Sequence, residues 1–425
     1  MTVGEELELA VTGYANGGAG IAHDPEGRVI FVTGALPDER VRVRIDDAKP
    51  AYAKAHVTRV LEASPQRVAP LCPAAAAGAG CCDLDYARPD YAATLRAGAL
   101  ADVLARIGHL RGDDVPPPPA VTELSGGVAG WRVRTRLAVG RDGVPGLRSR
   151  GSSQLVTEPC AAPDPGMLRG LGDLDAAPGT ELAVAVGSDG RRHVAELAPA
   201  PGGRGPAGSR RAAQRARHAA AAPRRTRMLD GDELVTQRVG GHTWRVPVSG
   251  FWQAHRAAPE TYGATVRDFA ARIHGAGPLR VWDLYGGAGV LGAALLDGES
   301  MDGVPPVARI DLVETAPEAL AAAHEALADA PVRLHRGDTA RVVRGLDAPD
   351  LVIADPPRKG AGAGVIAAVA DAGPRAVVHI GCDAAAFARD LRDYVRHGFR
   401  VIDWRAFDAF PLSHHTEAIA LLASP

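Results

Sequence analysis

The chain has 425 residues and a mass of 44.0 kDa, enough for two or three domains of roughly 150 residues each. Hydrophobic residues make up 46% of it and charged residues 23%, which is typical of a globular protein and excludes a wholly disordered one. The 48 Lys and Arg are balanced by 50 Asp and Glu, so the net charge of −2 excludes a polycation and leaves any affinity for nucleic acids to local basic patches. No apolar run approaches the roughly 18 residues of a membrane span, and residues 1–6 do not resemble a secretory signal. We therefore expect a monomeric, cytoplasmic protein without membrane contact.

Residues 1–62 are expected to form a small β-barrel. Aliphatic and polar side chains alternate in residues 7–11 and 41–45, which places the aliphatic ones on one face of a strand and Arg42 and Arg44 on the other. Turn sequences rich in Gly, Pro and Asp separate these short strands. Several short strands at such spacing are typical of a barrel.

Residues 63–250 are expected to form a small central α+β domain. Residues 66–83 are rich in Cys, Pro and Ala and show no clear period, and Pro89 then opens a helix. Residues 201–227 carry many arginines and no acidic residue between 204 and 227, which predicts a flexible loop that attracts phosphate groups.

Residues 251–425 alternate between apolar strands and Ala-rich helices. Continuously apolar strands in such an alternation predict a doubly wound, mostly parallel, Rossmann-like sheet of the α/β class. The expected strands are 279–284, 308–313, 332–335, 351–354, 376–380, 400–404 and 418–422.

Two motifs in this last domain indicate a cofactor site. The first expected strand runs into the sequence WDLYGGAG at 282–289, in which glycines let the backbone approach a ligand closely and the preceding Asp283 suits a ligand with an amino-acid tail. The next strand ends in Glu314, an acid that can accept both hydroxyls of a ribose. Because the chain has no Walker phosphate loop, S-adenosylmethionine fits this pair better than a nucleotide.

Three further positions follow expected strands and suit catalysis. The sequence DPPRKG at 355–360 has Arg358 where amino-methylating enzymes carry an aromatic residue, which argues against N-methylation. Cys382 directly follows an expected buried strand, and Glu417 directly precedes the last expected one. A cysteine and a glutamate at the edge of a cofactor-binding sheet supply a nucleophile and a base.

These motifs together resemble the RNA 5-methyluridine methyltransferases, which are class I S-adenosylmethionine-dependent enzymes. The N-terminal segment is similar to the TRAM domain, an OB-like RNA-binding module, and the resemblance extends over nearly the whole chain. The similar segments are 13–14, 17–22, 34–39, 251–255, 282–289, 355–360, 381–383, 388–390, 408–411 and 415–417.

The resemblance implies a mechanism and a set of roles. Cys382 adds to C6 of a uracil in structured RNA, C5 then takes the methyl group, and Glu417 removes the C5 proton. Arg358 would orient the target base. The cofactor contacts implied by the resemblance are Gln253, Tyr285, Glu314 and Asp355.

Departures from the family pattern affect the finer geometry. His255, Val290 and Asp383 each replace a residue that is Asn in the family. A subset of the family binds a [4Fe-4S] cluster through C-x5-C-x2-C and a distant cysteine, whereas the spacing here is C-x8-C-C. The residues leave a cluster, a zinc site or no metal as alternatives at Cys72, Cys81, Cys82 and Cys160.

Two rival functions also fit part of the pattern. An RNA 5-methylcytosine methyltransferase uses the same cysteine addition, but usually has its nucleophile in a Pro-Cys loop and lacks the terminal His-x-Glu. An RNA-binding or folding factor with an inactive methyltransferase domain is disfavoured, because both Cys382 and Glu417 are present. The sequence does not separate tRNA from rRNA as the target.

Overall fold

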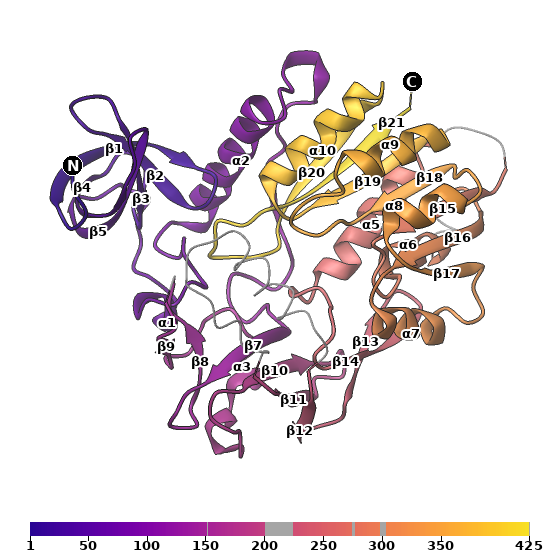
Figure 1. The fold of residues 1–425 in the computed structure, drawn as a ribbon, viewed down its shortest axis with the longest axis horizontal. Helices are drawn as coiled ribbons and strands as arrows, with labels where there is room; N and C mark the ends of the chain where they lie inside the picture. Colours follow the sequence, from indigo (N-terminus) through magenta and orange to yellow (C-terminus); the bar gives the residue numbers. More distant parts are fainter. Residues whose placement is uncertain (151, 200–223, 274–276, 298–302, 425) are drawn as a thin grey trace.

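The computed structural model describes residues 1–150, 152–199, 224–273, 277–297 and 303–424. A barrel forms one end of the molecule, an α/β unit forms the other, and a mainly antiparallel β unit lies between and below them (Figure 1). Most of the expected arginine-rich loop at 201–227 lies outside the described residues. Among the described residues, no helix has the length and apolar character needed to cross a bilayer.

The N-terminal unit is the expected closed barrel, with strand order β1-β2-β3-β5-β4. Its interior is filled by aliphatic side chains, including the fully buried Val41 and Val43. Arg42 and Arg44 point outward, where they pair with Glu8 and Glu6 at 2.8 and 2.9 Å. These two arginines are therefore not a free basic patch. The strands are β1 Glu6–Ala15, β2 Ala19–His23, β3 Val29–Thr33, β4 Arg40–Ala48 and β5 Tyr52–Glu62.

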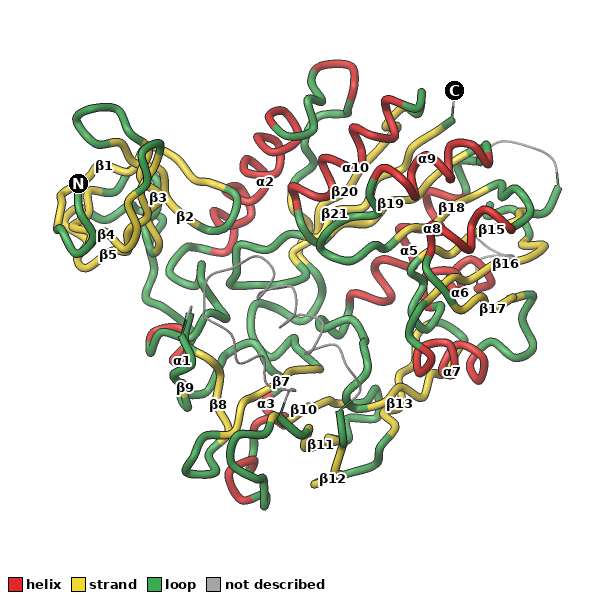
Figure 2. Tube along the Cα trace, viewed as in Figure 1, coloured by secondary structure: helices red, strands yellow, loops and turns green. Residues whose placement is uncertain are grey.

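The central unit contains a six-stranded antiparallel sheet of order β12-β11-β10-β7-β8-β9 and a separate hairpin, β13-β14 (Figure 2). The expected flexible loop ends earlier than residue 227, because Arg224 and Arg227 form ion pairs with Glu181 and Glu196. The strands are β7 Arg134–Val139, β8 Pro145–Arg148, β9 Leu155–Val156, β10 Glu181–Val186, β11 Arg192–Leu197, β12 Thr226–Asp230, β13 Leu234–Val239 and β14 His242–Pro247. The short helices are α1 Pro73–Ala76 and α3 Pro165–Leu168, with single 3-10 turns at Gly112–Asp114 and Leu171–Asp173.

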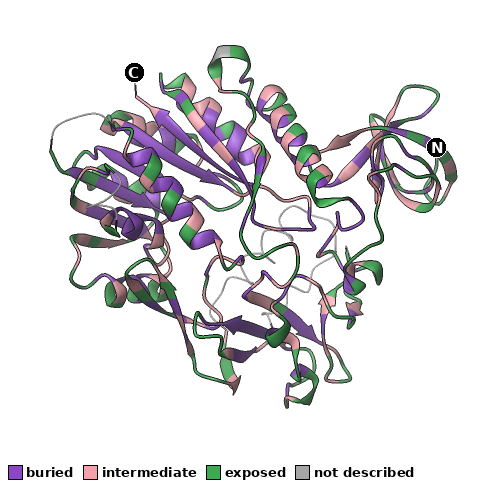
Figure 3. Ribbon diagram, turned by 180° about the vertical axis from the view of Figure 1, so that it is seen from behind, coloured by how far each residue is buried: buried purple, intermediate pink, exposed green. Residues whose placement is uncertain are grey.

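The C-terminal unit is the expected mostly parallel sheet, of order β17-β16-β15-β18-β19-β21-β20-β6. Its strands are β15 Leu279–Leu284, β16 Val307–Glu314, β17 Val332–Arg336, β18 Leu351–Ala354, β19 Ala376–Gly381, β20 Arg400–Asp408 and β21 Glu417–Ala423. The central strands are buried on both faces (Figure 3) because helices cover each side. The helices are α5 Ala258–Ala270, α6 Val290–Asp297, α7 Pro317–Ala326, α8 Thr339–Val342, α9 Ala363–Ala372 and α10 Ala384–Arg396, with a 3-10 turn at Val343–Gly345.

Two elements from before residue 125 join this C-terminal unit. Helix α2 (Pro89–Arg106) places Leu100, Val103 and Leu104 in the core shared with α9 and α10. Strand β6 (Val121–Glu123) pairs in parallel with β20 at the edge of the sheet. The apolar side chains of α2 therefore pack in the core of the C-terminal unit and not in the central unit.

Candidate active site

The expected site residues gather at one edge of the C-terminal sheet. Strands β15, β16, β18 and β19 run parallel, so their carboxyl ends share an edge, and Tyr285, Glu314, Asp355 and Cys382 lie at those ends. Strand β21 runs antiparallel to β19, so its first residue, Glu417, lies at the same edge.

The pairing register brings Cys382 close to Glu417. The ladder between β19 and β21 ends at the pair Gly381–Ala418, and Cys382 and Glu417 are the next residues of the two segments. The charge of Glu417 acts on the thiol of Cys382, as expected of neighbouring groups. Cys382 is half-buried and Glu417 is only 5% exposed, so the two face a recess and not open solvent.

Burial disfavours the charged forms of these groups and of Asp355 in the ligand-free protein. It raises the pKa of Cys382 to about 12, with the charges of Glu417 and Asp355 adding to the effect and Arg358 opposing it. Burial also raises the pKa of Glu417 well above its usual value, and that of Asp355 to about 7. The site therefore favours a positively charged ligand, since a nearby cation would lower all three pKa values.

Arg358 lies on a loop that Asp390 fixes from behind. The Asp390 carboxylate accepts hydrogen bonds from the backbone N–H of Ala361 at 2.7 Å and of Gly362 at 3.2 Å. Gly360 has a positive φ of 84°, and a Cβ there would lie 2.6 Å from Asp390 Oδ2. Only glycine fits this turn, which holds the exposed Arg358 beside the recess.

Asp390 is itself supported by His379. The His379 Nε2 lies 3.3 Å from Asp390 Oδ2, and both side chains are buried. Burial raises the pKa of Asp390, but His379 and the two loop N–H groups outweigh it, so the pKa is lowered overall. Asp390 is therefore an ionised acid that positions a loop.

Glu314 ends β16 beside the glycine loop. One carboxylate oxygen accepts the N–H of Gly287 at 3.1 Å. The other accepts the N–H of Ala316 at 2.8 Å, and also the backbone N–H and the hydroxyl of Thr315 at 2.5 and 3.0 Å. Of the two oxygens, the one bonded to Gly287 is therefore the one that keeps a further acceptor site. Glu314 thus closes the turn between the glycine loop and the next strand, and the half-buried Tyr285 enters the loop with a positive φ of 59°.

Asp283 has a different role from the one expected. We expected it to contact an amino-acid tail, but it is fully buried beneath the loop and accepts the N–H of Gly292 at 3.2 Å. A Cβ on Gly286 would lie 2.8 Å from the Asp283 carboxyl group. Asp283 therefore sets the path of the loop, and burial raises its pKa to about 7.

Gln253 follows a segment that packs on the glycine loop. Trp252 contacts Trp244 at a centroid distance of 5.8 Å, and Trp244 Nε1 donates to the backbone oxygen of Ala288 at 2.8 Å. Gln253 is half-buried. His255, two residues further on, stacks on a tryptophan at 5.3 Å and 12°, and burial lowers its pKa to about 4, so it is a neutral packing residue.

Two cavities adjoin the recess. A larger one of about 520 Å³ opens beside Arg358, and its wall includes Trp131, Phe410 and His415. A smaller one of about 110 Å³ is lined by Cys382 and by residues 14–17 of the barrel. The barrel therefore contributes directly to the surroundings of the candidate nucleophile.

A buried ion pair that the sequence analysis missed fixes the segment before Glu417. Arg96 on α2 binds Asp408 with two hydrogen bonds of 2.6 Å and also donates to the backbone oxygen of Ser413 at 3.3 Å. The signal was present, because Arg96 lies four residues before Leu100 on the apolar face of the expected helix. A charge on such a face requires a buried partner.

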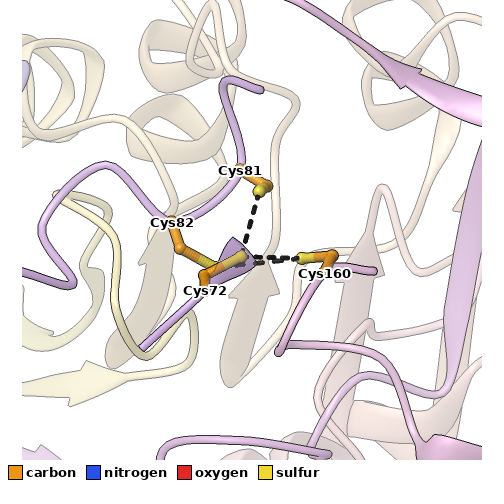
Figure 4. Close-up of side chains that lie close together, drawn as sticks. All are labelled: Cys72, Cys81, Cys82 and Cys160. Atoms are coloured by element: carbon orange, nitrogen blue, oxygen red, sulfur yellow. Dashed lines mark hydrogen bonds between the residues drawn. The ribbon is translucent and has the colours of Figure 1, made fainter. Parts of the chain in front are cut away.

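The four expected metal ligands converge in the central unit (Figure 4). All four Sγ atoms lie within 4.8 Å of one another, and the cysteines are not joined by disulfides. The closest pairs are Cys72–Cys81 at 3.7 Å, Cys72–Cys160 at 3.8 Å and Cys82–Cys160 at 3.8 Å. The structure thus brings together residues that are 88 positions apart in the chain.

Known proteins share this architecture. Residues 1–58 match the TRAM domain family. An uncharacterized RNA methyltransferase of Corynebacterium efficiens is 39% identical over 99% of this chain and 95% of its own length. A 23S rRNA (uracil(1939)-C(5))-methyltransferase of Chromohalobacter salexigens is 30% identical over 97% of this chain and 88% of its own.

A solved structure matches along the full length. The tRNA (uracil-54, C5)-methyltransferase of Pyrococcus abyssi, in complex with S-adenosyl-L-homocysteine, superposes with a TM-score of 0.67 and 17% identity over 98% of this chain and 99% of that one. A mostly parallel sheet with a glycine loop after one strand and an acid ending the next defines a class I S-adenosylmethionine-dependent methyltransferase domain. The chain belongs to the TRAM-containing RNA methyltransferase family that includes the uracil-C5 enzymes.

Proposed function

We propose that this protein transfers the methyl group of S-adenosylmethionine to C5 of a uridine in structured RNA, tRNA or rRNA, through covalent attachment of the uracil to Cys382. The observation that supports the proposal is the register of β19 and β21, which brings Cys382 and Glu417 close together at the edge that also bears the glycine loop. A nucleophile, a base and a methyl donor are the three components that this reaction needs.

The chemistry follows from the residue types. The thiolate of Cys382 adds to C6 and turns C5 into an enolate-like nucleophile. C5 takes the methyl group from the sulfonium, which leaves as the neutral thioether. Glu417 then takes the C5 proton, and the electrons of that C–H bond re-form the C5–C6 double bond as the bond from C6 to Cys382 breaks.

Protonation links the reaction to its ligands. Burial raises the pKa of both Cys382 and Glu417, yet the reaction needs a thiolate and a carboxylate. A sulfonium bound beside Asp355 would, together with Arg358, favour ionisation of both groups.

The cavities suit an extruded nucleotide. A uridine inside structured RNA must leave its stack before its C6 can be attacked, and aromatic side chains commonly receive such bases. The larger cavity offers Trp131 and Phe410 next to Arg358. We place RNA across this cavity and the barrel loop at residues 14–17. We keep the expectation of a cytoplasmic monomer, and light scattering of the purified protein can check the monomeric state.

The experiment uses RNA labelled at C5. Purified protein is incubated with S-adenosylmethionine and with tRNA or 23S rRNA that carries tritium at uridine C5, and the RNA is then digested to nucleosides. We expect tritium release together with 5-methyluridine, from one of the two RNAs only, and neither product with Cys382→Ala. Methyl groups found on cytidine, or on a base nitrogen, would contradict the proposal.

A further inference from the structure

We propose that Cys72, Cys81, Cys82 and Cys160 hold a single tetrahedral zinc ion in place of the [4Fe-4S] cluster that the family resemblance implies. The proposal rests on the spacing of the four sulfur atoms and on what surrounds them, and it is independent of the proposed reaction. Nothing in the comparisons assigns an ion to these cysteines.

The sulfur spacing matches one central ion. A zinc ion binds four thiolates at about 2.3 Å in a tetrahedron, whose edges are then about 3.8 Å. The closest contacts of Cys72 are 3.7 Å to Cys81 and 3.8 Å to Cys160, and Cys82 lies 3.8 Å from Cys160. The remaining pairs also lie within 4.8 Å, so one ion can reach all four atoms.

A four-iron cluster does not fit this spacing. In such a cluster each cysteine binds a different iron atom of the cube, so the cube holds the four sulfurs apart, well beyond van der Waals contact. Here three sulfur pairs lie 3.7–3.8 Å apart and all four sulfurs lie within 4.8 Å of one another (Figure 4). A cube would require the sulfurs to move apart.

The surroundings suit a charged four-thiolate centre. Cys72 Sγ accepts hydrogen bonds from the backbone N–H groups of Ala75 and Ala161, both at 3.4 Å. The Arg132 guanidinium interacts electrostatically with three of the sulfurs, those of Cys160, Cys82 and Cys81. Zinc with four thiolates carries a net charge of −2, which these donors and this cation offset.

The centre connects to the candidate base. Asp83 directly follows Cys82, and its carboxylate accepts the backbone N–H of His414 at 3.0 Å and lies 2.6 Å from His414 Nδ1. His414 precedes Glu417 by three residues. Cys81 and Cys160 also line the larger cavity. An ion here would therefore brace the cavity wall and the segment leading to Glu417, but not the glycine loop.

The test is a metal analysis of the full-length protein, purified without oxygen from cells supplied with both iron and zinc. We expect about one zinc per chain, no acid-labile sulfide, and an X-ray absorption spectrum with four sulfur neighbours at about 2.3 Å. Four iron and four sulfide per chain, with iron–iron scattering, would overturn the proposal, and so would a folded protein that contains no metal.

Two variants locate the ion. Cys160→Ser should lose at least tenfold in zinc affinity, measured by competition with a chelator, whereas Cys382→Ala should keep the full zinc content. Calorimetry should show S-adenosylmethionine binding unchanged in Cys160→Ser, because the glycine loop lies elsewhere. Zinc that is retained in Cys160→Ser and lost in Cys382→Ala would place the ion at the sheet edge and contradict the assignment. If Cys160→Ser does not fold, the metal content of the unmodified protein still decides the proposal.

Discussion

Glu417 and Asp408 are equally buried acids on neighbouring strands, at 5% and 7% exposure, but their surroundings are opposite. Asp408 receives two hydrogen bonds from Arg96, both of 2.6 Å. The Glu417 carboxyl group receives neither a hydrogen bond nor an ion pair from the described residues, and burial raises its pKa well above the usual value. Two acids of similar burial thus differ in their surroundings: Asp408 is paired with Arg96, and Glu417 has no partner among the described residues.

The difference separates reactive groups from supporting ones. Asp390 belongs with Asp408, since it is held by His379 and by two backbone N–H groups. Asp355 belongs with Glu417, because burial alone accounts for its pKa of about 7. Of these four acids, Asp355 and Glu417 have no partner among the described residues and are the ones that we propose to act on ligands, whereas Asp390 and Asp408 fix the segments around them. Glu314 differs from both groups, because we propose that it binds a ribose although its carboxylate already accepts backbone N–H groups.

The largest expected effect follows from removing the nucleophile. Cys382→Ala should reduce methyl transfer to below detection, because no other described thiol lies at this edge of the sheet. Its affinity for S-adenosylmethionine, measured by calorimetry, should stay within a factor of two or three of the unmodified protein. Methyl transfer at a normal rate by this variant would show that the Cys382 thiol is not needed for catalysis.

Breaking the ion pair between Arg96 and Asp408 should lower the stability of the fold and leave the chemistry of methyl transfer unchanged. Arg96→Leu leaves Asp408 buried without its partner and should lower the free energy of unfolding by about 3–5 kcal/mol. The matched control is Arg88→Leu near the start of the same helix, where loss of the exposed pair with Asp90 should change the stability little. Chemical denaturation measures both, and equal losses would remove the distinction between the two sites.

Glu314 tests the cofactor side of the comparison. Glu314→Ala should weaken S-adenosylmethionine binding by about 1–3 kcal/mol, the usual range for losing hydrogen bonds to a charged group. The exposed Glu318 on the following helix provides the control, and Glu318→Ala should leave calorimetric affinity unchanged. An unchanged affinity in the Glu314 variant would mean that the ribose binds elsewhere.

The smallest of the expected effects is on the pH dependence of Cys382 alkylation. Burial raises the pKa of Cys382 to about 12, so the reactive thiolate should increase about tenfold for each pH unit between 7 and 10 in the ligand-free protein. Arg358→Gln removes the charge that opposes this shift and should slow alkylation at every pH. Mass spectrometry of the peptide containing Cys382 measures the rate, and a plateau near pH 8 would contradict the assigned burial.

The sequence predicted local elements better than contacts between them. Strands 279–284 and 351–354 were expected with the bounds they have, because buried parallel strands are short apolar runs ended by Gly or Pro signals. The addition of β6 to the sheet was not predicted, because three residues carry no detectable period. Sequence spacing also favours no particular partner for Arg96, which binds Asp408 312 positions away.

The candidate site was also predicted only in part. The motifs predicted that Cys382, Glu417 and Asp355 lie at one edge of the sheet. The closeness of Cys382 to Glu417 depends on how β19 and β21 pair, which the motifs do not determine. The burial of Asp283 and the convergence of the adjacent Cys81 and Cys82 with a distant cysteine depend on tertiary packing. These contacts cannot be read from a linear pattern.

The central claim, that Glu417 acts as the base after Cys382 has attacked, is tested most directly with Glu417→Gln. This variant keeps the shape of the side chain and removes its basicity, so addition and methyl transfer should proceed while release of the product stalls. We predict a denaturant-stable complex of protein with methylated RNA, visible as a slowly migrating band, that disappears in the double variant Cys382→Ala, Glu417→Gln. Normal turnover by Glu417→Gln, or loss of activity without any covalent complex, would contradict the account.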